Sequence, residues 1–288
     1  MAAKADNSLF TFARWRQLMH LYARMDLNWL TQDTRACLIC IISDIFTMLS
    51  SISSVALLAV RFGGVGDLTA GETLFMLGFN GVVNGLFTML FCNFNVANIS
   101  RRIGRSQLDH MMIQPLPLYA HLMCEGFAPF TGTGALISGA AVTVWALCLL
   151  GLNLKWWAWL IMPLLIVCAV AILLMMSYLV SAAAFYRPVS CEEISSVMLD
   201  TLGTLSRFPL GGLGLGLRAA LVSAIPAGLL GWFPALILLG KALLFPGLLL
   251  PMCVAALVSV LAGRAFSRGL KHYLKVGSNR YRSVGHRN

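Results

Sequence analysis

Charged residues are scarce in this 288-residue chain: Asp, Glu, Lys and Arg together make up 11% of it, whereas hydrophobic residues make up 59%. A soluble domain carries about 25% charged residues, so the composition excludes an ordinary soluble globular fold. The apolar runs are long and uncharged, and they lack the alternating ten-residue segments of a membrane β-barrel. The sequence therefore predicts an all-α polytopic membrane protein.

Motifs for nucleotide, metal and acyl-transfer chemistry are also absent. The chain has no GxxxxGK[ST], HExxH or GxSxG motif, and its five histidines are scattered without ligand spacing. We therefore expect a chain that is not an enzyme, that hydrolyses no ATP itself and that holds no metal or cofactor. The adjacent Glu192 and Glu193 are interpreted as a solvated loop end rather than as an acid/base pair.

A signal peptide and a disulfide framework are missing as well. The first 35 residues are polar and aromatic, and the first long apolar run begins at Ala36, so the N-terminus is expected to stay cytoplasmic. Most of the eight cysteines lie inside apolar runs, which favours small buried hydrophobic residues over disulfides. Cys37 and Cys40 form a CxxC inside such a run, and without a second pair it does not indicate zinc or redox chemistry.

Hydropathy predicts six membrane-spanning helices, since a bilayer core takes about 20 residues per helix. They cover residues 36–60, 74–97, 127–150, 156–185, 209–231 and 247–267. With the N-terminus inside, seventeen Lys and Arg residues fall on the inner side and three fall outside, namely Arg61, Lys155 and Lys241. This bias predicts that both termini are cytoplasmic. The net charge of +10 then reflects contact with anionic lipid rather than with nucleic acid.

Three segments are not expected to cross the bilayer. Apolar residues recur at helical spacing between residues 8 and 30 opposite a basic face, which predicts an interfacial amphipathic helix within a cytoplasmic segment 1–35. Residues 232–246 are interrupted by prolines, which favours a re-entrant hairpin between spans five and six. Residues 268–288 form a basic cytoplasmic tail after the six-span domain 36–267.

Polar residues and prolines inside the spans are the candidates for a pathway or gate. Asp44 in the first span either lines a path or pairs with an asparagine of the neighbouring helix. Asn80 and Asn84 in the second span either bridge helices or form a polar translocation surface. Pro226 and Pro234 interrupt the last apolar block. Small residues of the third span, such as Gly134 and Gly139, indicate close helix packing.

The inner loop 98–118 is the richest of the segments predicted to face the cytoplasm. Ser106 is predicted to cap a short helix that runs from Gln107 to Ile113. Such a helix would expose basic and polar residues beside Leu108, Met111 and Met112. An amphipathic knob of this kind suits insertion into a partner's groove; the alternative is a loop that lies on lipid. The candidate partner-binding residues are Arg101, Arg102, Arg105, Leu108, Asp109, Met112 and Pro115.

Several short motifs, in order along nearly the whole chain, resemble the type-2 (ABC-2) exporter permeases, and within them the viologen-exporter-like branch. They are Leu-Asp-x-x-Met-x-x-Pro in the inner loop, Arg-Phe-Pro, Ser-Ala-Ile-Pro-Ala, and Trp-Phe-Pro-Ala-x-x-x-Leu-Gly. The residues that carry the resemblance are Leu108, Asp109, Pro115, Phe208, Pro209, Pro226, Pro234, Leu239 and Gly240.

The resemblance implies one permease of an exporter in a bacterial plasma membrane. The 101–115 loop would be the coupling helix that docks on an ABC ATP-binding subunit, and the 8–30 helix would be the connecting helix. Two such ATP-binding subunits would hold ATP and Mg, and a second permease, identical or homologous, would complete the pathway. The weakly charged spans fit a hydrophobic or amphipathic cargo.

Two other classes of protein remain alternatives on the sequence alone. An ion-coupled secondary transporter would need no ATPase, but it would normally show denser intramembrane charge or two similar halves. A membrane scaffold would have no open pathway between protomers.

Overall fold

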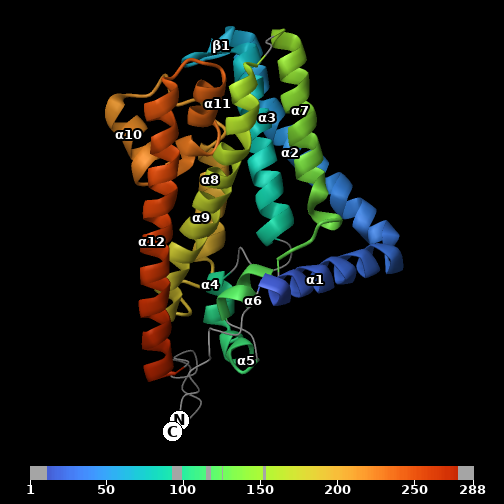
Figure 1. Cartoon of the computed structure of the whole chain (residues 1–288), viewed down its shortest axis with the longest axis vertical. Helices are drawn as coiled ribbons and strands as arrows, with labels where there is room; N and C mark the ends of the chain where they lie inside the picture. The colour runs from blue at the N-terminus through green and yellow to red at the C-terminus, as the bar shows by residue number, and fades with distance from the viewer. Residues whose placement is uncertain (1–11, 93–98, 115–117, 125, 152–153, 278–288) are drawn as a thin grey trace.

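Figure 1 shows the computed structural model, in which long helices run side by side and short helices lie toward both ends. It describes residues 12–92, 99–114, 118–124, 126–151 and 154–277. The long helices are α2 (Thr34–Phe62), α3 (Ala70–Phe87), α7 (Gly134–Leu150), α8 (Trp156–Ser181) and α12 (Leu244–Val276). The fold is therefore the all-α polytopic architecture that the composition predicts.

The two ends of this bundle differ in structure. A two-stranded hairpin, β1 (Gly64–Val65) and β2 (Leu68–Thr69), marks the β end. Three short helices mark the α5 end: α4 (Ile99–Gly104), α5 (Leu108–Met112) and α6 (Leu118–Cys124). The remaining short segments are η2 (Thr88–Cys92), η4 (Thr131–Thr133), η5 (Ala182–Phe185), α9 (Ile194–Leu205), α10 (Leu215–Ser223), η6 (Pro226–Leu229) and α11 (Trp232–Leu238).

Five of the six predicted spans correspond to long apolar helices. Within the described ranges, the helices long and apolar enough to cross a membrane are Thr34–Phe62, Ala70–Phe91, Thr131–Cys148, Trp156–Phe185 and Leu244–Val276. The end of the second predicted span, residues 93–97, lies outside the described residues. These matches confirm a multi-pass membrane protein.

The predicted fifth span, 209–231, is wrong as a continuous helix. The chain instead forms α10 and then the segment Pro226–Leu238, and the two are bent by 68°. Pro226 explains the break, because it lacks a backbone N–H and stands at the start of η6. Residues 194–205, predicted as an inner loop, form the apolar helix α9, which packs against α8.

The re-entrant hairpin is real but starts earlier than the sequence predicted. A Cβ on Gly66 at the β end would lie 2.8 Å from the backbone N of Gly212. From there the chain runs into the bundle as far as Gly231, where an added Cβ would lie 3.0 Å from Asn80 Nδ2. It then returns toward the β end, where Lys241 Nζ contacts Glu72 Oε2 at 2.7 Å. Glu72 and Asn80 are eight residues, or about 12 Å, apart along α3. Residues 211–241 therefore dip into the bundle and come back to the β end.

The helix α1 (Phe12–Gln32) lies crosswise to the long helices (Figure 1), and it confirms a helix over most of the predicted 8–30 segment. Residues 8–11 lie outside the described residues. Asp26 on α1 is buried, and its carboxylate accepts hydrogen bonds from the backbone N–H of Phe130 at 2.7 Å and of Thr131 at 3.2 Å. The Thr131 hydroxyl donates to the same carboxylate at 2.5 Å. This contact ties α1 to the chain that leads into α7.

Glycines bring α3 and α7 into close contact, as the small residues of the third span predicted. A Cβ on Gly139 would lie 2.4 Å from the carbonyl carbon of Gly81, and a Cβ on Gly85 would lie 2.4 Å from Leu136 Cα. Only glycine permits this approach of two helix backbones. Gly81 and Gly85 of α3 therefore serve the packing of two helices within one chain.

Candidate functional site

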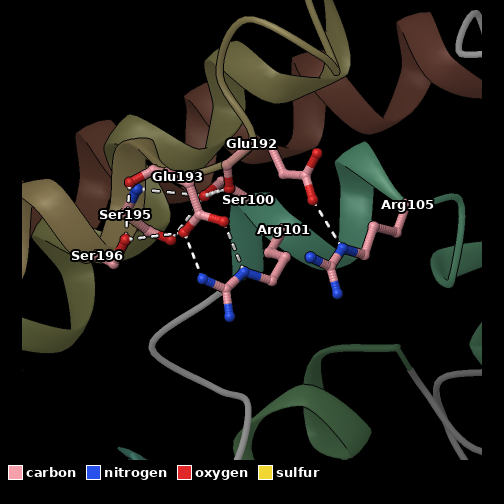
Figure 2. Close-up of polar contacts among 7 residues, drawn as sticks. All are labelled: Ser100, Arg101, Arg105, Glu192, Glu193, Ser195 and Ser196. Carbon is pink, nitrogen blue, oxygen red and sulfur yellow. Dashed lines mark hydrogen bonds and ion pairs between the residues drawn. The ribbon is translucent and has the colours of Figure 1, made fainter.

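The candidate site lies at the α5 end, where α4 meets the chain that leads into α9 (Figure 2). The Ser100 side chain is fully buried there, and its hydroxyl donates to the carbonyl of Glu192 at 2.7 Å. Its oxygen also accepts a hydrogen bond from the backbone N–H of Ser195 at 3.2 Å, and the two serine hydroxyl oxygens are 2.7 Å apart. Ser195 belongs to the first turn of α9, whose N–H groups have no partner within the helix. Ser100 therefore caps α9 from a different helix.

Two arginines beside Ser100 pair with the two glutamates before α9. Arg101 binds Glu193 with two parallel hydrogen bonds, from Nε to Oε1 at 2.8 Å and from Nη2 to Oε2 at 2.5 Å. Arg105 Nε donates to Glu192 Oε1 at 2.6 Å. Bidentate arginine–carboxylate pairs fix geometry as well as charge. We call the set of Ser100, Arg101, Arg105, Glu192, Glu193 and Ser195 the α4–α9 clasp; Figure 2 draws it together with Ser196.

The clasp also shifts the titration of its charged groups. The hydrogen bonds from Arg101 lower the pKa of Glu193, and a hydrogen bond from Ser196 acts in the same direction. The hydrogen bonds to Glu193 raise the pKa of Arg101 in turn. Both shifts favour the charged forms that the ion pair requires.

Glycine at position 104 allows α4 to lie this close. A Cβ on Gly104 would be 2.8 Å from the carbonyl oxygen of Pro188 and 3.2 Å from Glu192 Cγ. The obstacle is partly backbone, which cannot rotate away as a side chain can. Any larger residue would push α4 off the chain before α9.

The predicted partner-binding residues separate into buried and exposed groups. Arg102 is buried, and its Nη1 lies 3.5 Å from Met111 Sδ. Leu108 and Met111 are also buried, so these two do not contribute to the amphipathic knob that the sequence predicted. Met112 is half-buried. The large exposed apolar residue at the end of α5 is Ile113, with 82% of its surface accessible, which the sequence reasoning did not single out.

The helix predicted over 107–113 is present in shorter form, because α5 covers Leu108–Met112. Its N-cap is Gln107 rather than Ser106, and no side chain caps it. Ser106 instead adopts a left-handed backbone with φ of 59°, which turns the chain between α4 and α5. Asp109 accepts a hydrogen bond from the Tyr273 hydroxyl at 2.9 Å, so α5 is also joined to α12. Pro115 lies outside the described residues.

One of the two predicted asparagines of α3 joins this helix to another part of the chain. Asn80 is buried, and its Nδ2 donates to the carbonyl of Ser206 at 3.2 Å. Asn84 Nδ2 donates to Asn80 Oδ1 at 2.6 Å. Ser206 directly follows α9, so this bridge holds the far end of α9 against α3. The geometry matches the bridging interpretation for Asn80, whereas the hydrogen bonds of Asn84 stay within α3.

The other gate candidates lie apart from the clasp. Asp44 is half-buried against the start of α7, where a Cβ on Gly134 would lie 2.9 Å from Asp44 Cβ. It makes no hydrogen bond to Asn80 or Asn84, so the predicted pairing does not form with either. Pro226 and Pro234 are both buried in the re-entrant hairpin, Pro226 at its bend and Pro234 within α11.

The helix α9 carries a polar exposed face that the sequence analysis missed. Val197, Asp200 and Thr204 are exposed at spacings of three and four residues. They line a groove of about 380 Å³ with Thr201 and Leu205. The signal was present as a helical period, but the segment was interpreted as a loop between Arg187 and Arg207.

A bundle of membrane-crossing helices, a crosswise amphipathic helix, a re-entrant hairpin at one end and docked short helices at the other define a polytopic transport protein. The profile of the ABC-2 family transporter proteins matches residues 34–277. The chain therefore belongs to the ABC-2 transporter family, whose members are membrane components of transporters. Neither the curated proteins nor the solved structures gave a significant match.

Proposed function

We propose that this chain is the permease subunit of an ATP-binding-cassette exporter that moves a hydrophobic or amphipathic substrate outward. The single observation that carries the proposal is the α4–α9 clasp in a chain of the ABC-2 family. ATP and Mg would be held by a separate nucleotide-binding subunit, present in two copies. A second permease, identical or homologous, would face this one, as in the viologen-exporter-like branch that the sequence resembles.

The contacts supply a mechanical route for coupling. A partner that moves α4 and α5 must also move the start of α9, because Ser100, Arg101 and Arg105 hold that start. The twelve residues of α9 span about 18 Å and end at Ser206, which Asn80 holds. The re-entrant hairpin follows directly. Motion at the α5 end would therefore reach the hairpin through α9 and through the turns of residues 206–214 that follow it.

The hairpin has its own attachment, which we propose acts as a latch on the closed pathway. Trp232 Nε1 donates to Asp67 Oδ1 at 3.0 Å, and Lys241 Nζ donates to the Asp67 carbonyl at 3.0 Å. Lys241 also pairs with Glu72 at 2.7 Å. These bonds tie the second limb of the hairpin to the turn between α2 and α3. Opening the pathway at the β end would require this latch to release.

The exposed face of α9 is the proposed pathway surface in this chain. A charged side chain at membrane depth usually marks a functional path. Asp200 meets that description, since it is exposed on an apolar helix between the clasp and Asn80. Facing the second permease, this surface would contact the cargo.

The test replaces Ile113, the exposed apolar residue that directly follows α5. Ile113→Asp should abolish recovery of an ATP-binding subunit with the tagged chain and should leave membrane insertion intact. The matched control is Leu274→Asp, since Leu274 is 64% exposed on α12, one residue beyond the Tyr273 contact to α5. Loss in the Ile113 variant alone supports docking through α5. Equal recovery in both variants would contradict it, and an ion-coupled transporter would be indifferent to both changes.

A further inference from the structure

The helix α12 continues well beyond the length that a bilayer requires. Its 33 residues span about 50 Å, whereas the hydrocarbon core is about 30 Å thick. The twenty residues from Leu244 to Gly263 carry no charge and match that thickness. Arg264 therefore stands at the boundary between hydrocarbon and headgroups, at the side where α12 runs on toward the α5 end.

A groove of about 650 Å³ opens on α12 at this boundary. Three cations line it, Arg264, Arg268 and Lys271, at spacings of four and three residues on one helix face. Small residues, Ser259, Gly263 and Ser267, form the rest of its floor with Val260. The concavity results from these small side chains, because larger ones would fill it.

The three cations are available to a ligand. All three side chains are exposed, and within the described residues none of them forms an ion pair or a side-chain hydrogen bond. The arginines of the α4–α9 clasp differ in this respect, because each pairs with a glutamate. Three unneutralised cations around one concavity favour a single anionic group.

We propose that this groove binds the headgroup of an anionic phospholipid. The apolar side chains above it, Leu257, Val260 and Leu261, are 59%, 48% and 43% exposed and offer a surface for the acyl chains. The phosphodiester lies at the level of Arg264, where a lipid in the same leaflet already has its phosphate. Basic pockets beside membrane helices bind such headgroups through this combination of charge and position. The site does not depend on the transport cycle proposed above.

The test measures bound lipid in the intact chain. The wild-type chain is placed in nanodiscs of mixed phosphatidylglycerol and phosphatidylcholine. Native mass spectrometry then counts the lipids that stay bound to the protein after it is released from the nanodisc. We expect one retained phosphatidylglycerol per chain. R264Q/R268Q/K271Q should weaken this binding on the order of 100-fold, from about fivefold per cation near the surface.

Two further variants separate a built site from general surface charge. R16Q/R24Q/R35Q removes the same charge from exposed positions on α1 and α2 and should keep the bound lipid. Gly263→Leu keeps every cation but fills the groove; a Cβ there meets no atom within 4 Å, so the chain tolerates it. It should lose the lipid. Equal lipid retention in all four proteins, or equal loss in both triple variants, would overturn the proposal.

Other occupants give distinct results. Displacement of the retained lipid by millimolar inorganic phosphate would assign the groove to a free anion and overturn the lipid proposal. Loss of a co-purifying acidic protein from R264Q/R268Q/K271Q, with its lipid count unchanged, would assign the groove to that protein instead. Retained phosphatidylglycerol that resists phosphate and disappears in the Gly263→Leu chain supports the lipid.

Discussion

Replacing Ser100 with alanine should detach α4 from α9 without unfolding the chain. The change removes a fully buried hydroxyl that donates to the Glu192 carbonyl and accepts from the backbone N–H of Ser195. Loss of a cap at a helix N-terminus costs about 0.5–2 kcal/mol, and a buried group left unsatisfied costs about 1–3 kcal/mol. We expect a local cost of about 2 kcal/mol, or roughly a 30-fold more open clasp.

Amide hydrogen exchange in nanodiscs measures this opening directly. Peptides that cover α4 and the first turn of α9 should exchange roughly 30-fold faster in the Ser100→Ala chain, because exchange follows local opening. The control is Ser54→Ala, since Ser54 makes an exposed bond within α2, to the Ser51 carbonyl at 2.8 Å. It should change exchange by a factor of about two at most.

A double-mutant cycle sharpens the same prediction. Ser195→Ala removes the hydroxyl that lies 2.7 Å from Ser100 Oγ. Because the two side chains share one contact, the double variant should cost less than the sum of the single variants. Unchanged exchange at α4 in Ser100→Ala, or strict additivity in the cycle, would refute the reasoning that these serines hold α4 on α9.

Four other predictions concern the Arg101–Glu193 pair, the Asp26 contact and the hairpin latch. Arg101→Glu should loosen the clasp and Arg101→Glu/Glu193→Arg should restore it, as measured by exchange at α4. Because the pKa of Glu193 is lowered in the folded chain, the clasp should stay closed as the pH falls past the ordinary glutamate pKa, and it should open only at lower pH. Opening that begins above the ordinary glutamate pKa would contradict a stabilised Glu193 carboxylate. Asp26→Ala should leave the backbone N–H groups of Phe130 and Thr131 without their acceptor and weaken the docking of α1 by about 1–3 kcal/mol. Proteolysis of α1 should then be faster than in the wild-type chain, and an unchanged rate of cleavage would contradict this role of Asp26. Lys241→Met should release the hairpin latch and raise substrate leak in reconstituted vesicles while ATP-binding subunits remain bound; vesicles as tight as wild type would argue against a latch.

The sequence predicted the long helices because their apolar runs exceed the bilayer thickness without interruption. It failed at α9, whose twelve residues are too short to fill a hydropathy window. Asp200 inside that helix and Glu192, Glu193 and Arg207 around it lower the average further. Residues 209–231 are apolar enough to be predicted as a span, although Pro226 breaks the helix there. Hydropathy does not register the backbone N–H that proline lacks.

The candidate site was predictable in place but not in its contacts. The inner loop 98–118 was identified, yet Arg101 and Arg105 were assigned to a partner rather than to Glu193 and Glu192. These pairs join residues about ninety positions apart, and no local pattern reveals which charges meet. Leu108 was expected to face a partner for the same reason, although tertiary packing buries it.

Whether this chain is a permease with an ATPase partner can be measured by purifying the tagged chain from its native membrane in a gentle detergent and identifying every bound protein by mass spectrometry. We expect a stoichiometric protein with a Walker A motif, together with a second permease that is either identical or homologous. Recovery of the chain alone, under conditions that preserve other ATP-binding-cassette complexes, would show that it is not such a permease.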